Sequence, residues 1–93
     1  MAEIFVTRSD VELSPWRFHV TVRDGGSSTT HDVTVSSEDF ERLGSSHGSP
    51  EDFLLACFAF LLEHEAKESI LSEFDVTAIG GYFPDFESKI QGF

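Results

Sequence analysis

Ten consecutive apolar residues, Phe53 to Leu62, occupy the middle of the chain. Ser49 and Pro50 come before them: a serine side chain can accept a hydrogen bond from the third helical amide, and proline suits the first helical position because its missing N–H would be unpaired there anyway. The apolar run has no polar face, so we expect a helix from Pro50 to about Ala66 that is buried on nearly every side. The run is too short to span a bilayer, which takes roughly 20 apolar residues.

Two runs of alternating apolar and polar residues precede the helix, at Trp16–Arg23 and Thr30–Ser36. Such period-two alternation predicts β-strands with one buried face. The stretch Asp24–Thr29 between them is rich in turn-forming residues, so the two strands should form a hairpin. Their apolar residues share one face only if opposed residues have numbers that add to an odd total, as when Val20 lies opposite Val33.

The β-prone run Glu3–Arg8 predicts a third strand, and Val11 and Leu13 extend this pattern until Ser14-Pro15 interrupts it. After the hairpin, Ser36–Gly44 combines serine caps, early acids and a final glycine, which are typical of a short helix. We therefore expect one compact α+β domain over residues 1–93, in which a three-stranded antiparallel sheet packs on the buried central helix.

Short C-terminal helices complete the expected fold. Asp75 can cap a helical piece in which Val76, Ile79 and Phe83 recur at helical spacing, and Pro84 can begin a last turn.

The chain is strongly acidic, with 17 acidic and 6 basic residues and a formal net charge of −11. Such a surface repels phosphate backbones and anionic lipids, which disfavours binding to nucleic acid or to a membrane surface. The charge serves solubility, or it forms an acidic face that meets a protein partner with a basic face. Cys57 is the single cysteine, and the N-terminus lacks the basic and long apolar regions of a secretory signal, so we expect a cytoplasmic protein.

Candidate chemistry is sparse. His64 and Glu68 share a helix face at i, i+4, but two ligands do not make a catalytic metal site, and the alternative is a solvated helix end with local ion pairs. Cys57, buried in the helix, lacks the access and the activating base that a nucleophile needs. His19 and His31 should lie on opposite faces of the hairpin, with His31 a hydrogen-bonded structural residue. We expect no catalytic site, no metal and no cofactor.

The C-terminal third carries residues at a moderately specific spacing: Lys67-Glu68-Ser69-Ile70-Leu71, Phe74-Asp75, Ile79 and Tyr82-Phe83-Pro84. This pattern resembles a small bacterial protein family to which no activity is attached, and the likeness extends from the sheet region to Ile90. Ala66 stands where that family carries proline, which would allow the central helix to run further. The resemblance implies a compact bacterial domain and no particular chemistry.

The leading hypothesis is a non-enzymatic protein-interaction domain that uses its acidic surface or its aromatic tail. Tyr82, Phe83, Phe86 and Phe93 could cover the core or form a protein-binding patch. A homodimer through the sheet edge or the tail is a further possibility. The predicted interaction surface consists of His64, Lys67, Glu68, Asp75, Tyr82, Phe83 and Phe86.

The alternative is a transcriptional regulator or antitoxin. A strand at Val33–Val35 followed by two helices resembles the ribbon-helix-helix order, in which a strand from each subunit enters the DNA major groove. The ribbon-helix-helix hypothesis requires a dimer in which Thr34 lies in a strand that pairs with the other subunit. The outward residues of this strand contain no Arg or Lys, which weakens the alternative; they are Thr30, Asp32, Thr34 and Ser36.

Overall fold

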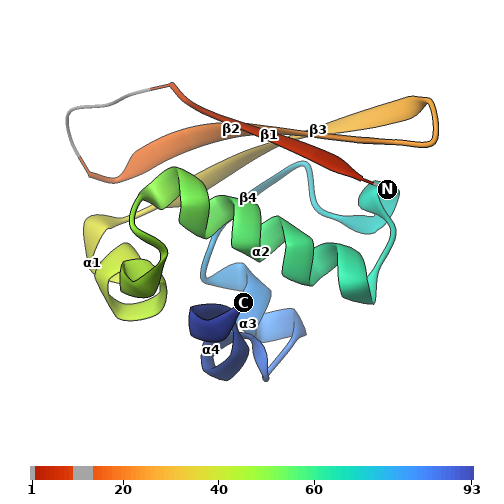
Figure 1. Ribbon diagram of the computed structural model, residues 1–93. Coiled ribbons are helices and arrows are strands. Elements are labelled where there is room, and N and C mark those ends of the chain that lie inside the picture. Colours follow the sequence, from red (N-terminus) through yellow and green to blue (C-terminus); the bar gives the residue numbers. More distant parts are fainter. Residues whose placement is uncertain (1, 10–13) are drawn as a thin grey trace.

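Four strands form one sheet in the order β1-β2-β3-β4 in this computed structural model, which describes residues 2–9 and 14–93 (Figure 1). The strands are β1 (Glu3–Arg8), β2 (Trp16–Asp24), β3 (Ser27–Val35) and β4 (Glu73–Asp75). The first three are antiparallel, and β4 runs parallel to β3. The α+β class is confirmed, but the sheet has four strands and is mixed. The predicted extension through Val11 and Leu13 lies outside the described residues.

The fourth strand escaped prediction because it is too short for its alternation to be recognised. It is three residues long, and its pairing depends on β3. The amide of Asp32 donates to the Ser72 carbonyl at 2.8 Å, and the amide of Val76 donates to the Thr34 carbonyl at 3.0 Å. These bonds join segments about 40 residues apart, and such pairing leaves no local signal.

A two-residue turn joins β2 to β3, shorter than the predicted loop at Asp24–Thr29. Gly25 and Gly26 have φ angles of 64° and 84°, which glycine adopts freely and which suit a tight hairpin turn. The turn places Val20 opposite His31, so opposed numbers add to 51. The predicted odd total is confirmed, although the example pair of Val20 with Val33 is wrong.

The alternation along the hairpin separates a core face from an outer face. His31 lies on the core face and is 2% exposed. His19 is exposed on the other face, where its Nδ1 lies 3.0 Å from an Asp32 carboxylate oxygen. The predicted placement of the two histidines is confirmed. The sheet contributes Phe18, Val20, Val22, Val33 and Val35 to the core.

Both helical segments between the hairpin and the centre begin at the serines that the sequence indicates. Before α1 (Ser37–Asp39), Ser36 Oγ accepts from the Asp39 amide at 3.0 Å. The chain continues through a π-helical turn (Phe40–Gly44) and a 3-10 turn (Ser45–His47). Before α2 (Pro50–His64), Ser49 Oγ accepts from the Asp52 amide at 3.1 Å.

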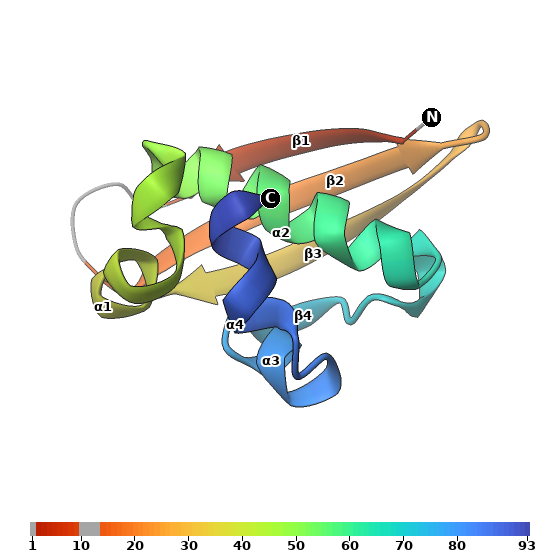
Figure 2. The same ribbon diagram turned by 60° about the horizontal axis from the view of Figure 1, so that its bottom comes forward.

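Helix α2 is the middle layer of the molecule, with the sheet on one side and the C-terminal helices on the other (Figures 1 and 2). Those helices are α3 (Ala78–Tyr82), α4 (Phe86–Lys89) and a final 3-10 turn (Ile90–Gly92). The buried residues of α2 recur at intervals of three and four and share one broad face, which the two coverings enclose. The expectation of burial on nearly every side is therefore wrong. Burial is not complete, since Leu55 is 38% exposed.

Helix α2 ends at His64, two residues before the predicted end. Glu65 is extended (φ −153°, ψ 160°), and a 3-10 turn follows at Lys67–Ser69. Alanine at position 66 therefore does not lengthen the helix. The chain must reverse here, because the segment ending at Ser72 is held against β3 by the backbone bond from Asp32.

Arg8 connects β1 to the first turn of α2. Its guanidinium donates a forked pair of hydrogen bonds to the Glu51 carboxylate, at 3.0 and 2.8 Å. The same group lies 5.2 Å from the centre of the Trp16 ring and 5.4 Å from that of Phe18. These hydrogen bonds lower the pKa of Glu51.

Asp75 is the last residue of β4, and its side chain caps the turn that leads into α3. Its carboxylate accepts from the amide of Thr77 at 3.0 Å and from the Thr77 hydroxyl at 2.8 Å. Near the C-terminus, the Ile90 carbonyl accepts a hydrogen bond from His47 Nε2 at 2.6 Å.

Over the described residues, no helix combines the length and the apolar character needed to cross a bilayer.

Candidate functional site

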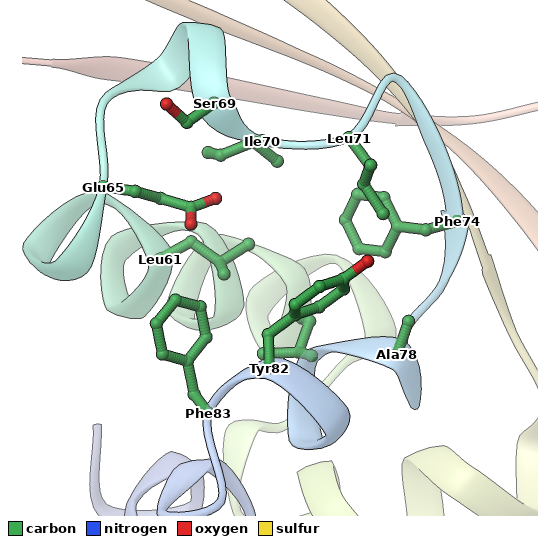
Figure 3. A pocket seen from close by; sticks show the side chains of 10 residues that line it. Leu61, Glu65, Ser69, Ile70, Leu71, Phe74, Ala78, Tyr82 and Phe83 are labelled. Atoms are coloured by element: carbon green, nitrogen blue, oxygen red, sulfur yellow. The ribbon is translucent and has the colours of Figure 1, made fainter.

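A small pocket opens where the end of α2 faces α3 (Figure 3). Its volume is about 110 Å³. The apolar walls are Leu61, Ile70, Leu71, Phe74, Ala78 and Ile79. Glu65, Ser69, Tyr82 and Phe83 complete the lining.

Glu65 is the acidic group of the pocket, and the early end of α2 places it there. Its backbone is extended, and Figure 3 shows its carboxylate turned toward Leu61 and Ile70. Within the described parts of the chain, no hydrogen-bond or ion-pair partner lies against this carboxylate. The residue is half-buried, so the charge is partly shielded from water and available to a bound group.

The wall formed by Ile70 and Leu71 is held by the sheet. His31 Nδ1 donates to the Leu71 carbonyl at 2.7 Å, next to the backbone bond from Asp32 to Ser72 at 2.8 Å. Leu71 is thereby fixed at the pocket with its side chain outward, 46% exposed. An exposed leucine on a rigid segment is pre-organised for contact with another molecule.

The aromatic side of the pocket comes from α3 and the residue that follows it. Tyr82 is 66% exposed. Phe83 is half-buried and stacks on His64, with ring centres 5.0 Å apart and planes at 27°. Its edge meets Phe60, 5.9 Å away between ring centres. The Phe83 ring is held by these neighbours, whereas most of Tyr82 is free to contact a partner.

The size of the pocket limits what it can hold. Small-molecule and cofactor sites usually measure about 300–1,000 Å³, and a cavity of about 150 Å³ is enough for benzene. A volume near 110 Å³ therefore suits one side chain of a protein partner.

Part of the predicted interaction surface lies at this pocket. Tyr82 and Phe83 line it, and His64 supports Phe83 from outside. Asp75 is exposed but caps the turn before α3. Glu68 is exposed and forms an ion pair with Lys67 at 2.8 Å, and this hydrogen bond lowers the pKa of Glu68.

Two residues of that predicted surface are not on the surface, and the prediction is wrong for them. Phe86 is fully buried, where its ring meets Phe60 at 5.4 Å between centres. The Lys67 side chain is 9% exposed, with its ammonium group reaching Glu68. The Phe86 ring covers α2, as a small domain requires, and the aliphatic stem of Lys67 is buried while its charged tip meets Glu68.

The metal hypothesis loses its geometric basis because α2 ends at His64. Glu68 lies in the following 3-10 turn, so the two residues do not share a helix face. Among the described residues, no group of three or more His, Cys, Asp or Glu side chains is placed to hold a metal ion.

Cys57 and β3 are both enclosed by the fold. Burial raises the pKa of the Cys57 thiol well above its usual range.

Thr34 lies in β3, which pairs with β2 on one side and β4 on the other. The intermolecular strand pairing that a ribbon-helix-helix regulator requires at Thr34 is therefore occupied within the chain.

Most of the net acidic charge lies in the part of the chain that builds the pocket. Residues 36–93 carry a formal net charge of −9, against −2 for residues 1–35. All six basic side chains are already engaged: five in ion pairs and Arg23 over the Phe5 ring, 5.4 Å from its centre. The five ion pairs are Arg8–Glu51, Arg17–Glu73, Arg42–Glu87, Lys67–Glu68 and Lys89–Asp85.

Glu65, Leu71 and Phe74 are the site residues that sequence reasoning missed. Glu65 reads as one more polar residue at a helix end, and only the position of that end turns it inward. Leu71 and Phe74 are large apolar residues among polar ones, and such residues usually belong to the core. The available signal was the density of large side chains after α2 without a clear helical period.

Comparison of the chain with protein-family models, with curated proteins and with solved structures gave no match. The resemblance of the C-terminal pattern to a bacterial family stays a prediction, and the pocket itself is the basis for assigning a function.

Proposed function

We propose that this protein is a non-enzymatic interaction domain that binds a basic segment of a partner protein at the pocket between α2 and α3. One observation carries the proposal: an apolar pocket of side-chain size holds the unpaired carboxylate of Glu65 and is bordered by the exposed side chains of Leu71 and Tyr82. These walls supply contact area and one charge, which are the elements of recognition.

The distribution of exposed apolar residues supports this location. Single exposed hydrophobic residues are normal on any protein, whereas grouped ones indicate a binding surface. Leu71 and Tyr82 border the same pocket and are respectively 46% and 66% exposed. Tyrosine is also enriched where proteins bind one another, since it offers a large rigid surface and a polar tip.

The charge supports a basic partner. A formal charge of −9 over residues 36–93 attracts cationic surfaces, raises their association rate and repels acidic competitors. A bacterial cytoplasm is part of the same proposal, supported by the free thiol of Cys57 and by the resemblance of the C-terminal pattern.

Site-specific photocrosslinking tests the proposal. A benzoylphenylalanine at position 82 should yield a crosslinked protein adduct in cells, and the adduct's crosslinked peptide should be rich in Lys or Arg. The same probe at position 55 is the matched control, because Leu55 is 38% exposed on α2 but does not line the pocket.

Glu65→Gln supplies the second comparison in the position-82 protein. Its adduct should become weaker, and raising the salt concentration should weaken the wild-type adduct as well. Equal adducts from positions 55 and 82, or a position-82 adduct insensitive to Glu65→Gln, would contradict the proposal.

A further inference from the structure

We infer that the side chain entering the pocket is an arginine of the partner, with its guanidinium hydrogen-bonded to Glu65 and placed against the rings of Tyr82 and Phe83. This inference rests on the proposed function and names the chemical group that the site recognises.

The pocket favours a side chain that is apolar along its stem and charged at its tip. The walls near α3 and β4 are apolar, while Glu65 lies at the end of α2 (Figure 3). A purely apolar occupant would cover the Glu65 carboxylate without giving it a partner, and burying an unpaired charge is unfavourable. Long cationic side chains place their methylene groups on apolar surface and keep the charge at a polar end.

The same molecule already contains an arginine bound in this way. Arg8 lies 5.2 Å from the centre of the Trp16 ring and 5.4 Å from that of Phe18, and its two N–H groups reach the Glu51 carboxylate at 3.0 and 2.8 Å. The pocket presents the corresponding receptor groups, two aromatic rings and one carboxylate, without an arginine of the chain itself.

The charge distribution favours a cation from a different protein. All six basic side chains of this chain are engaged in ion pairs or over a ring, so a second copy has no unengaged basic residue to offer. Two copies also repel one another, since each carries a formal net charge of −11.

Arginine fits these groups better than lysine does. The guanidinium is planar, stacks on aromatic rings, gives a forked pair of hydrogen bonds to a carboxylate and is more weakly hydrated than an ammonium group. A lysine would form an ion pair with Glu65 but could not stack a planar group on the rings of Tyr82 and Phe83.

Titration of the ¹⁵N-labelled full chain with four matched peptides tests the inference. The probes are acetyl-Gly-Ser-X-Ser-Gly-amide with X as arginine, lysine, citrulline or phenylalanine. The arginine peptide should shift the amide signals of Glu65, Leu71 and Tyr82 with a dissociation constant on the order of 1 mM, as expected for one side chain. Citrulline keeps the shape of arginine without its charge and should bind at least about threefold more weakly.

Two variants separate the contributions of charge and ring. Glu65→Gln should weaken arginine binding about three- to tenfold, which corresponds to a partly exposed charge-assisted contact. Tyr82→Leu should reduce the preference for arginine over lysine. Leu55→Ala should bind like the wild type, and an unchanged signal pattern elsewhere in each spectrum would show that the variant is folded.

Each remaining outcome counts against the inference. Equal binding of citrulline and arginine, or of lysine and arginine, overturns it. If the phenylalanine peptide shifts the pocket signals and the arginine peptide does not, the arginine assignment fails while the proposed interaction site stands. If the four peptides leave the pocket signals unchanged and the position-82 probe gives no Glu65-dependent adduct, both fail.

Discussion

The imidazole of His31 joins the core of the sheet to the wall of the pocket, because its Nδ1 donates to the carbonyl oxygen of Leu71 at 2.7 Å. A carbonyl oxygen accepts and cannot donate, so Nδ1 carries a proton. Nε2 forms a hydrogen bond with the Thr29 hydroxyl at 2.8 Å. Both ring nitrogens are satisfied at a site that is 2% exposed, with the ring packed against Phe58.

Replacing His31 by leucine should therefore destabilise the domain. The change removes two partly buried hydrogen bonds, to the Leu71 carbonyl and to the Thr29 hydroxyl, and we expect a loss of about 1–2 kcal/mol in the free energy of unfolding. Urea unfolding followed by circular dichroism would measure it. His19→Leu is the matched control: its imidazole is exposed and pairs with Asp32 at the surface, so the change should stay within about 0.5 kcal/mol. Equal losses in the two variants would contradict this account.

The ion pair between Arg8 and Glu51 should contribute to acid sensitivity. Arg8 lowers the folded-state pKa of Glu51 below its unfolded value of about 4.3. Ionised Glu51 therefore stabilises the fold above the unfolded pKa, and this contribution disappears as the pH falls through the lower folded-state pKa. The Glu51 side chain is 36% exposed, so we expect about 1 kcal/mol or less. Urea midpoints of Glu51→Gln and wild type, measured from pH 7 to pH 3, should converge at the acid end.

A double-mutant cycle identifies the source of that effect. Arg8→Met keeps an apolar stem between the rings of Trp16 and Phe18 and removes the charge. In this background, Glu51→Gln should no longer change the slope of stability against pH. If the pH effect of Glu51→Gln were equally large in the Arg8→Met background, a group other than Arg8 would be its cause.

Gly44 lies so close to the rings of Phe53 and Phe40 that there is no room for a side chain at this position. A Cβ atom at this position would lie 2.5 Å from Cγ of Phe53 and 3.0 Å from Cδ1 of Phe40. Gly44→Ala must displace a fully buried ring, so we expect a loss of about 1–3 kcal/mol, measured by thermal or urea unfolding.

Gly81 provides the opposite case with the same substitution. It lies in α3, and a Cβ atom there would meet nothing within 4 Å. Gly81→Ala should be neutral or stabilise the domain by up to about 1 kcal/mol, because alanine favours the helix. A destabilised Gly81→Ala together with an unaffected Gly44→Ala would refute the packing described for both positions.

Cys57 should react with thiol reagents only when the domain opens. Its side chain is fully buried in α2, and burial raises the pKa of the thiol well above its usual range, so little thiolate is present at neutral pH. Labelling by a disulfide reagent should be slow in native buffer and complete within seconds to minutes in concentrated urea. Rapid labelling of the native protein would show that this part of the core is accessible.

Local rules were sufficient for much of the fold. Ser49 caps α2 because hydroxyl oxygens and free amides meet wherever a helix begins, and this requires no knowledge of the rest of the molecule. The parity of the hairpin register follows from the alternation along two strands, and the same alternation predicts His31 at the edge of the apolar face.

The exact register and the fourth strand needed information beyond local pattern. The pair of Val20 with His31 depends on the two-residue turn at Gly25-Gly26, and several turn lengths were compatible with the polar stretch. Residues Glu73–Asp75 become a strand through contact with β3, more than 35 residues away in sequence. Their side chains alternate, but three residues are too few to predict a strand.

The candidate site was predicted in part, for the same reason. Tyr82 and Phe83 stood out by their aromatic character, but aromatic residues serve core and surface equally, and Phe86 beside them is buried. Glu65 became a site residue through the backbone turn that ends α2. That turn follows from tertiary contacts, so the position of the carboxylate could not be read from the residue's neighbours.

The position of α2 between two coverings links occupancy of the pocket to the integrity of the whole domain. Leu61 lines the pocket and belongs to the buried face of the helix that packs between the sheet and the C-terminal helices, so a molecule held there binds the folded chain and not the unfolded one. At a hundredfold excess over its dissociation constant, such a ligand adds about 2.7 kcal/mol of stability. In a domain of this size that raises the melting temperature by roughly 10–20 °C. Candidate partners can therefore be ranked by the increase in the domain's melting temperature that each one produces.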